Sequence, residues 1–218
     1  MTPYCNRAVE IDSVTLPAAG EKSSPDDRAL MTSVFAGRLV LLYEELTQAA
    51  PKALLSDIEE LIALYREVVR SGDGALLSGG EVNKYLDRLH SFDLANCKFE
   101  SVKVGAVDYA YEGLPDTRTP GVVSFELRNS GAEVHELSLY RKNAGVKGTL
   151  DELLKQPRAK FEEKMTLVGR ASTPPGGRDH VLGRLTPGDY AVVCFQSITK
   201  AGGPAHHTKG MFEEFKVA

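Results

Sequence analysis

The stretches GDYAVVC (residues 188–194) and HHTKGM (residues 206–211) are the most informative parts of this chain. The first is rich in β-branched and aromatic residues, which is typical of a β-strand, and it ends on a cysteine. The second follows a loop that contains Gly and Pro, and it supplies two imidazoles and a thioether. Soft sulfur and borderline nitrogen donors in this combination suit copper. The sequence therefore predicts a metal site at the end of a strand near the C-terminus.

A further ligand has to come from another part of the chain, and His135 is the best candidate. It lies in NSGAEVHELSL (residues 129–139), where a turn that contains glycine enters an alternating strand. Two His and one Cys in a trigonal plane with a weak axial Met form the blue-copper arrangement. The expected metal ligands are therefore His135, Cys194, His206 and Met211. The same donors would also suit Zn²⁺ or Cu(I) in a tetrahedral site.

Apolar residues in the second half of the chain repeat with a period of two, separated by Gly, Pro and Asn. This pattern begins after Cys97 and runs to the last strand, FEEFKV (residues 212–217). A short helical insert is expected over residues 149–156. Several strands with turns between them in a segment of this size predict a Greek-key β-sandwich.

The first half of the chain has helical periodicity instead. Residues 12–24 are rich in Ser, Pro, Gly and Ala and are expected to form a loop. A helix begins at Ser24-Pro25, with Phe35, Leu39, Leu42 and Leu46 on its inward face, and ends before Pro51. Two more helices are expected over residues 54–72 and 81–94. We therefore predict an α+β protein with a helical bundle at 1–98 and a β-sandwich domain at 99–218.

Composition excludes several functional classes. The net charge of −4 and a pI near 5.8 provide no basic field for a polyanion, so nucleic acid is not an expected partner. No apolar run is long enough to span a membrane, and the N-terminus lacks the regions of a signal peptide. The sequence also lacks the motifs of common hydrolases and metalloproteases. His90 is expected to be isolated, His180 to be exposed and without a function, and Tyr190 to be a core aromatic.

Residues from about 101 to 218 resemble the cupredoxins, the plastocyanin-like family of small copper proteins. Three patterns carry the resemblance in the expected order: PGVVSFELRNSG (residues 120–131), GDYAVVC, and HHTKGMFEEFKV (residues 206–217). The resemblance implies one type 1 copper ion and one-electron transfer. One departure is the eleven residues between Cys194 and His206, where the family has a much shorter connection. His207 competes with His206, because both spacings to Met211 occur in the family; we favour His206 for its place near Pro204.

The remaining cysteines, Cys5 and Cys97, lie near the two ends of the helical half. A disulfide between them would indicate an oxidising compartment, whereas two free buried thiols would fit a cytosolic protein. We favour the disulfide, because it would staple one domain at both ends. The motifs Tyr4-Cys5 and Ala95-Asn96-Cys97 are also similar to those that open and close helical domains of exported actinobacterial proteins.

The sequence thus predicts a non-enzymatic electron-transfer protein with one copper ion, located outside the cytoplasm or in the cell envelope. A membrane tether through a removed lipoprotein signal is compatible with this expectation. Its redox partner is not identified by the sequence. Two alternatives are extracellular copper capture or delivery, and a metal-free scaffold that acts as a cell-surface binding module.

Overall fold

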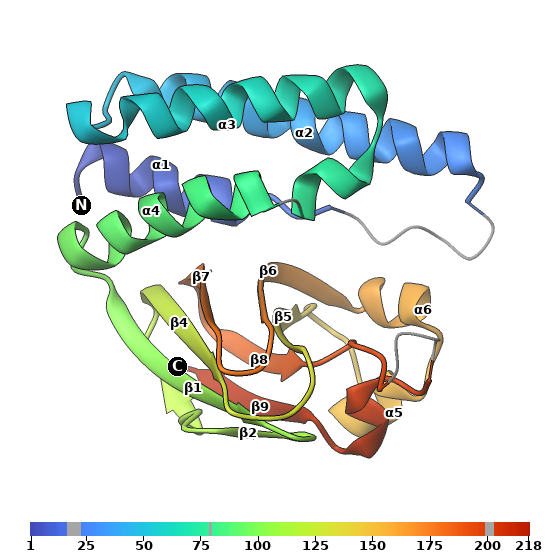
Figure 1. Cartoon of the computed structure of the whole chain (residues 1–218). Coiled ribbons are helices and arrows are strands. Elements are labelled where there is room, and N and C mark those ends of the chain that lie inside the picture. The colour runs from blue at the N-terminus through green and yellow to red at the C-terminus, as the bar shows by residue number, and fades with distance from the viewer. Residues whose placement is uncertain (17–22, 79, 199–202) are drawn as a thin grey trace. The chain divides into compact units, whose positions relative to one another are not determined.

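The computed structural model describes residues 1–16, 23–78, 80–198 and 203–218. The chain divides into two compact units, Met1–Lys98 and Phe99–Ala218. The first is helical and the second is a two-sheet β-sandwich (Figure 1). The α+β class expected from the change of hydrophobic period is therefore confirmed. We refer to the two parts as the helical unit and the β unit.

The described part of the helical unit contains four α-helices and a short 3₁₀ turn. They are α1 (Pro3–Asp12), α2 (Pro25–Thr47), α3 (Lys52–Ser71), η1 (Gly74–Ser78) and α4 (Gly80–Asn96). In α2, the Ser24 side chain accepts a hydrogen bond from the Asp27 backbone N–H, and the Asp27 side chain accepts from the Ser24 backbone, which makes a capping box. Gly72 ends α3 in the left-handed conformation. Among the described residues, no helix combines the length and the apolar character that a membrane span requires.

Two details of the helical unit differ from expectation. Helix α1 was not predicted; Thr2 caps it by accepting a hydrogen bond from Cys5 N, and Pro3 occupies its first turn. The buried face of α2 is formed by Ala36 and Tyr43 with Leu39 and Leu46, while Phe35 and Leu42 are only partly buried. The expected loop at 12–24 lies partly outside the described residues.

A disulfide joins Cys5 in α1 to Cys97, directly after α4, across a sequence separation of 92 residues. The predicted pairing is confirmed, and the alternative of two free thiols is excluded. Cys194 is the free cysteine of the chain and is buried. The cross-link closes the helical unit on itself and leaves the site cysteine in the other unit available.

The β unit consists of two sheets that face each other. The four-stranded sheet has the order β2 (Ala110–Glu112), β1 (Glu100–Val107), β4 (Gly121–Asn129), β7 (Arg178–Leu185). The five-stranded sheet has the order β3 (Thr117–Arg118), β9 (Phe212–Val217), β8 (Gly188–Val193), β5 (His135–Lys142), β6 (Met165–Thr173). Pairs β1/β4 and β3/β9 are parallel, and the other pairs are antiparallel.

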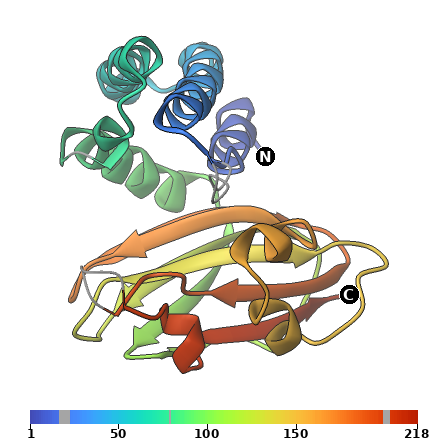
Figure 2. The same cartoon turned by 90° about the vertical axis from the view of Figure 1, so that its right-hand side faces the viewer.

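Strand β8 shows how both faces of the five-stranded sheet are covered. Tyr190, Val192 and Cys194 belong to the core between the sheets, whereas Ala191 and Val193 belong to a second core on the outer face. That outer core lies under α5 (Leu150–Leu154) and α6 (Arg158–Glu162), the gold helices in front of the sandwich in Figure 2. The helical insert expected at 149–156 therefore contains α5, while α6 was not predicted.

Candidate metal centre

Cys194 directly follows β8, and the alternation of the strand directs it into the sandwich. Its side chain is fully buried and its backbone N–H donates to the Met211 carbonyl at 3.1 Å. Burial raises the pKa of the thiol to about 11, while the backbone N–H of Glu136, 3.4 Å from Sγ, acts in the opposite direction. The metal-free molecule therefore holds a neutral thiol at neutral pH, and metal binding must displace its proton.

Two buried imidazoles converge on this sulfur. His135 is the first residue of β5, and His206 begins the 3₁₀ turn η2 (His206–Lys209). The two Nδ1 atoms lie 3.1 Å apart, and His206 Nδ1 lies 3.4 Å from Cys194 Sγ. One donor atom from each of the three residues lies within 4.8 Å of the other two. Segments far apart in sequence thus place two nitrogens and one sulfur in a single buried cluster.

Met211 belongs to the same buried core as Cys194. Its backbone N–H donates to the His206 carbonyl at 3.2 Å, and its carbonyl accepts a hydrogen bond from the Cys194 backbone N–H. The backbone of Met211 is therefore hydrogen-bonded to two of the other expected ligands.

His207 is not part of the donor cluster. Its ring packs on Phe195 with a centroid distance of 4.9 Å.

The described residues on the two sides of the long connection between Cys194 and His206 pair with each other. Ser197 and Ala205 form a β-bridge, and Ile198 N donates to Pro204 O at 3.1 Å. His206 N then donates to Gln196 O at 2.8 Å. Because residues on the two sides of the insertion pair with each other, the insertion does not move His206 away from Cys194.

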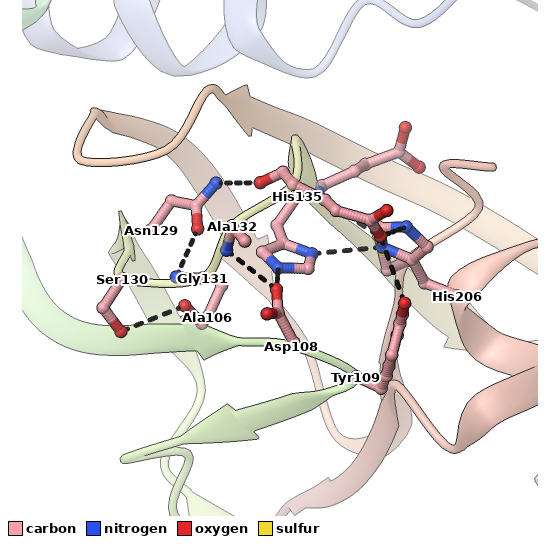
Figure 3. Close-up of polar contacts among 12 residues, drawn as sticks. Ala106, Asp108, Tyr109, Asn129, Ser130, Gly131, Ala132, His135 and His206 are labelled. Atoms are coloured by element: carbon pink, nitrogen blue, oxygen red, sulfur yellow. Dashed lines mark hydrogen bonds and ion pairs between the residues drawn. The ribbon is translucent and has the colours of Figure 1, made fainter. Parts of the chain in front are cut away.

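A carboxylate lies beside the outer nitrogen of each histidine, and Figure 3 shows the one from Asp108 beside His135. Asp108 Oδ1 lies 3.2 Å from His135 Nε2, and Glu133 Oε2 lies 3.0 Å from His206 Nε2. Burial and the neighbouring His135 lower the pKa of His206, and the Glu133 charge partly opposes this shift. The pKa of Asp108 is lowered chiefly by the hydrogen bond from Ala132 N, with a contribution from His135. Sequence analysis did not identify either carboxylate.

A second polar group lies on the sulfur side of the cluster. The Glu136 side chain is buried, with its carboxylate accepting hydrogen bonds from Ser138 Oγ at 2.5 Å and Gln196 Nε2 at 3.2 Å. Arg170 Nε forms an ion pair with it at 3.5 Å. Tyr111 donates its hydroxyl to the Glu136 carbonyl. These contacts join the start of β5 to the segment that follows Cys194, so they hold the two sides of the cluster together.

The donor set fits copper on chemical grounds. Two imidazole nitrogens, a cysteine sulfur and a neighbouring thioether suit both oxidation states of copper, whereas a structural zinc site is usually completed by four strong donors. Full burial of His135, Cys194, His206 and Met211 would exclude water from a bound ion. The arrangement is typical of a type 1 copper site.

The other two histidines named in the sequence are placed differently from expectation. His180 lies in β7, paired with Glu126, and is buried rather than exposed. His90 is not isolated, because its Nε2 lies 3.6 Å from Asp12 within the helical unit. Tyr190 is a buried core residue, as expected, and its hydroxyl donates to Thr186 O at 3.0 Å.

Comparison with known proteins found no matching family model and no matching curated protein. Similar solved structures include auracyanin from Roseiflexus castenholzii, with 19% identity, a TM-score of 0.36, and coverage of 54% of this chain and 96% of that chain. Auracyanin A, a "blue" copper protein from Chloroflexus aurantiacus, has 16% identity, a TM-score of 0.36, and coverage of 54% and 98%. Reduced rusticyanin has 18% identity, a TM-score of 0.32, and coverage of 56% and 81%.

The expected resemblance of the helical half to exported actinobacterial proteins has no support among these comparisons. Similarity at this level carries no inference about the function of the chain. The two-sheet topology and the buried Cys and His donors are properties of the chain itself. Residues 99–218 form a cupredoxin-like β-sandwich, which follows the helical unit in the sequence.

Proposed function

We propose that the β unit binds one copper ion and carries single electrons. The observation that supports this proposal is the buried convergence of His135 Nδ1, His206 Nδ1 and Cys194 Sγ. His135, Cys194 and His206 would hold the ion, and Met211 would be an additional, weaker donor. When bound, copper supplies a one-electron couple.

The chain's own residues would keep the site similar in both oxidation states. Cys194 releases its proton on binding, and the Glu136 N–H then donates to the resulting thiolate sulfur. His135 is fixed at the start of a paired strand, and His206 is fixed by its backbone bond to Gln196. Ligands held by the fold need little rearrangement when an electron is gained or lost.

We further propose that the protein works outside the cytoplasm. The Cys5–Cys97 disulfide supports this location, since structural disulfides are uncommon in reducing compartments. The described part of the β unit offers one cluster of Cys and His donors, and no second copper group of the kind an oxidase would need is found there. We therefore propose a carrier rather than an enzyme, with a protein redox partner.

Cyclic voltammetry and copper-exchange kinetics, measured on the same protein, distinguish a carrier from a protein for copper capture or delivery. A carrier is expected to show a reversible one-electron wave and to retain its copper in the presence of a competing chelator. Rapid loss of copper to the chelator without a reversible wave would favour delivery. A protein that binds no copper would support the scaffold alternative.

A further inference from the structure

Both histidines of the donor cluster have a carboxylate on the side opposite to the cluster. His135 presents Nδ1 to the cluster and Nε2 to Asp108, while His206 presents Nδ1 to the cluster and Nε2 to Glu133. The two imidazole side chains are fully buried, whereas Asp108 and Glu133 are 42% and 30% exposed. Each carboxylate therefore lies between a buried ring and the surface.

Local structure fixes Asp108 in this place. The backbone N–H of Ala132 donates to Asp108 Oδ1 at 2.9 Å, and the same oxygen lies beside His135 Nε2. Gly131 is required here, because a Cβ at this residue would overlap both Asp108 Oδ1 and the His135 ring. Asn129 Oδ1 accepts a hydrogen bond from the Gly131 backbone at 2.9 Å and so holds the turn.

Glu133 is fixed by a strained neighbour. Tyr109 has a φ of 66°, an uncommon conformation for a residue other than glycine. In this conformation its ring packs edge-on against His206 at 5.3 Å, and its hydroxyl lies 3.3 Å from Glu133 Oε2. Strain of this kind persists only where surrounding contacts hold it. The contact between Glu133 and His206 is not aligned as a hydrogen bond, so its effect is primarily that of a nearby negative charge.

A histidine that binds a metal through Nδ1 keeps its proton on Nε2, and a nearby carboxylate can accept a hydrogen bond from this N–H. Such a partner fixes the tautomer and makes the imidazole a stronger donor. Negative charge near the site also favours the more highly charged oxidation state. We propose that Asp108 and Glu133 act as paired positioning residues that stabilise Cu(II) over Cu(I) and so lower the reduction potential; this inference rests on the proposed function.

The test uses the full chain with the substitutions Asp108→Asn and Glu133→Gln, alone and together. Both substitutions retain size and an oxygen acceptor but remove the charge. Each is expected to change the preference for Cu(II) over Cu(I) about tenfold, a typical effect of an outer partner, and so to raise the midpoint by about 59 mV for one electron. The double variant is expected to show the sum of the two shifts.

Asp189→Asn is the matched control, because it removes the same charge from β8 at a position five residues before Cys194, about 16 Å along the strand. A thiolate-to-copper absorption band in every variant would show that the site is formed. Shifts no larger than the control's, with the band intact, would overturn this inference and leave the proposed function standing. Absence of the band from the unaltered protein would overturn both.

Discussion

Breaking the Cys5–Cys97 disulfide is expected to destabilise the helical unit and leave the metal site intact. The cross-link spans 92 residues, and the chain-entropy relation gives about 4.6 kcal/mol for a loop of this length. For a unit of 98 residues, an unfolding entropy of about 2.1 cal/mol/K per residue converts this free energy into a fall in Tm on the order of 20 °C.

Thermal unfolding followed by far-ultraviolet circular dichroism, with and without dithiothreitol, measures this effect. Reduction of the unaltered protein is the cleaner perturbation, since both cysteine side chains are retained. Cys5→Ser should show at least as large a loss, while copper binding by the β unit should not change. A helical transition that is insensitive to reductant would refute the entropic reasoning. Loss of copper binding in Cys5→Ser, measured without dithiothreitol because this dithiol itself binds and reduces copper, would show that the two units are coupled.

Met211→Leu, which preserves volume in a buried place, should leave copper bound but raise the potential measured by voltammetry. His206→Ala should weaken Cu(II) binding in an isothermal titration and His207→Ala should not; the reverse order would transfer the ligand role to His207. Burial raises the pKa of Asp93 from 3.8 to about 7. Between these two pH values the folded state keeps a proton that the unfolded state has lost. The free energy of unfolding should therefore fall by up to about 4 kcal/mol as pH rises from about 4 past 7. The free energy of unfolding in urea, measured across this pH range, should lose much of its pH dependence in Asp93→Asn but not in Asp87→Asn, an exposed residue on the same helix. An equal pH dependence in the two variants would contradict the raised pKa of Asp93.

Much of the donor cluster was predictable, because its signals are local. A cysteine at the end of an apolar strand and a histidine in a turn before an alternating strand are visible within a few residues. The structure brings Cys194, His135 and His206 together as expected, with Met211 in the same buried core. The roles of these residues as ligands stay predictions until metal binding is measured.

The carboxylates behind the histidines were not predictable in the same way. Glu133 lies two residues before His135, but its partner is His206, which is 73 residues away in sequence. Asp108 is 27 residues from His135, and the two meet only because the turns after β1 and β4 lie together. Such contacts depend on tertiary packing, which leaves no periodic signal in the chain.

The helical half was predicted less accurately, because two of its helices have weak signals in the sequence. Helix α1 has only 10 residues and no long apolar repeat, although Thr2 and Pro3 form a recognisable start. In α2 the apolar residues occupy more than one face, with Leu30, Val34 and Leu41 exposed, so sequence alone did not decide which face would be buried. The prediction for α3 was correct because its apolar residues lie on one face.

The visible absorption spectrum after addition of Cu(II) shows whether Cys194 binds copper. We expect an intense thiolate-to-copper band in the unaltered protein and its loss in Cys194→Ser, because a hydroxyl cannot replace the soft sulfur donor. The unaltered protein before copper addition serves as the baseline. Tight Cu(II) binding without such a band, or a band that survives in Cys194→Ser, would contradict the assignment of Cys194 as a copper ligand.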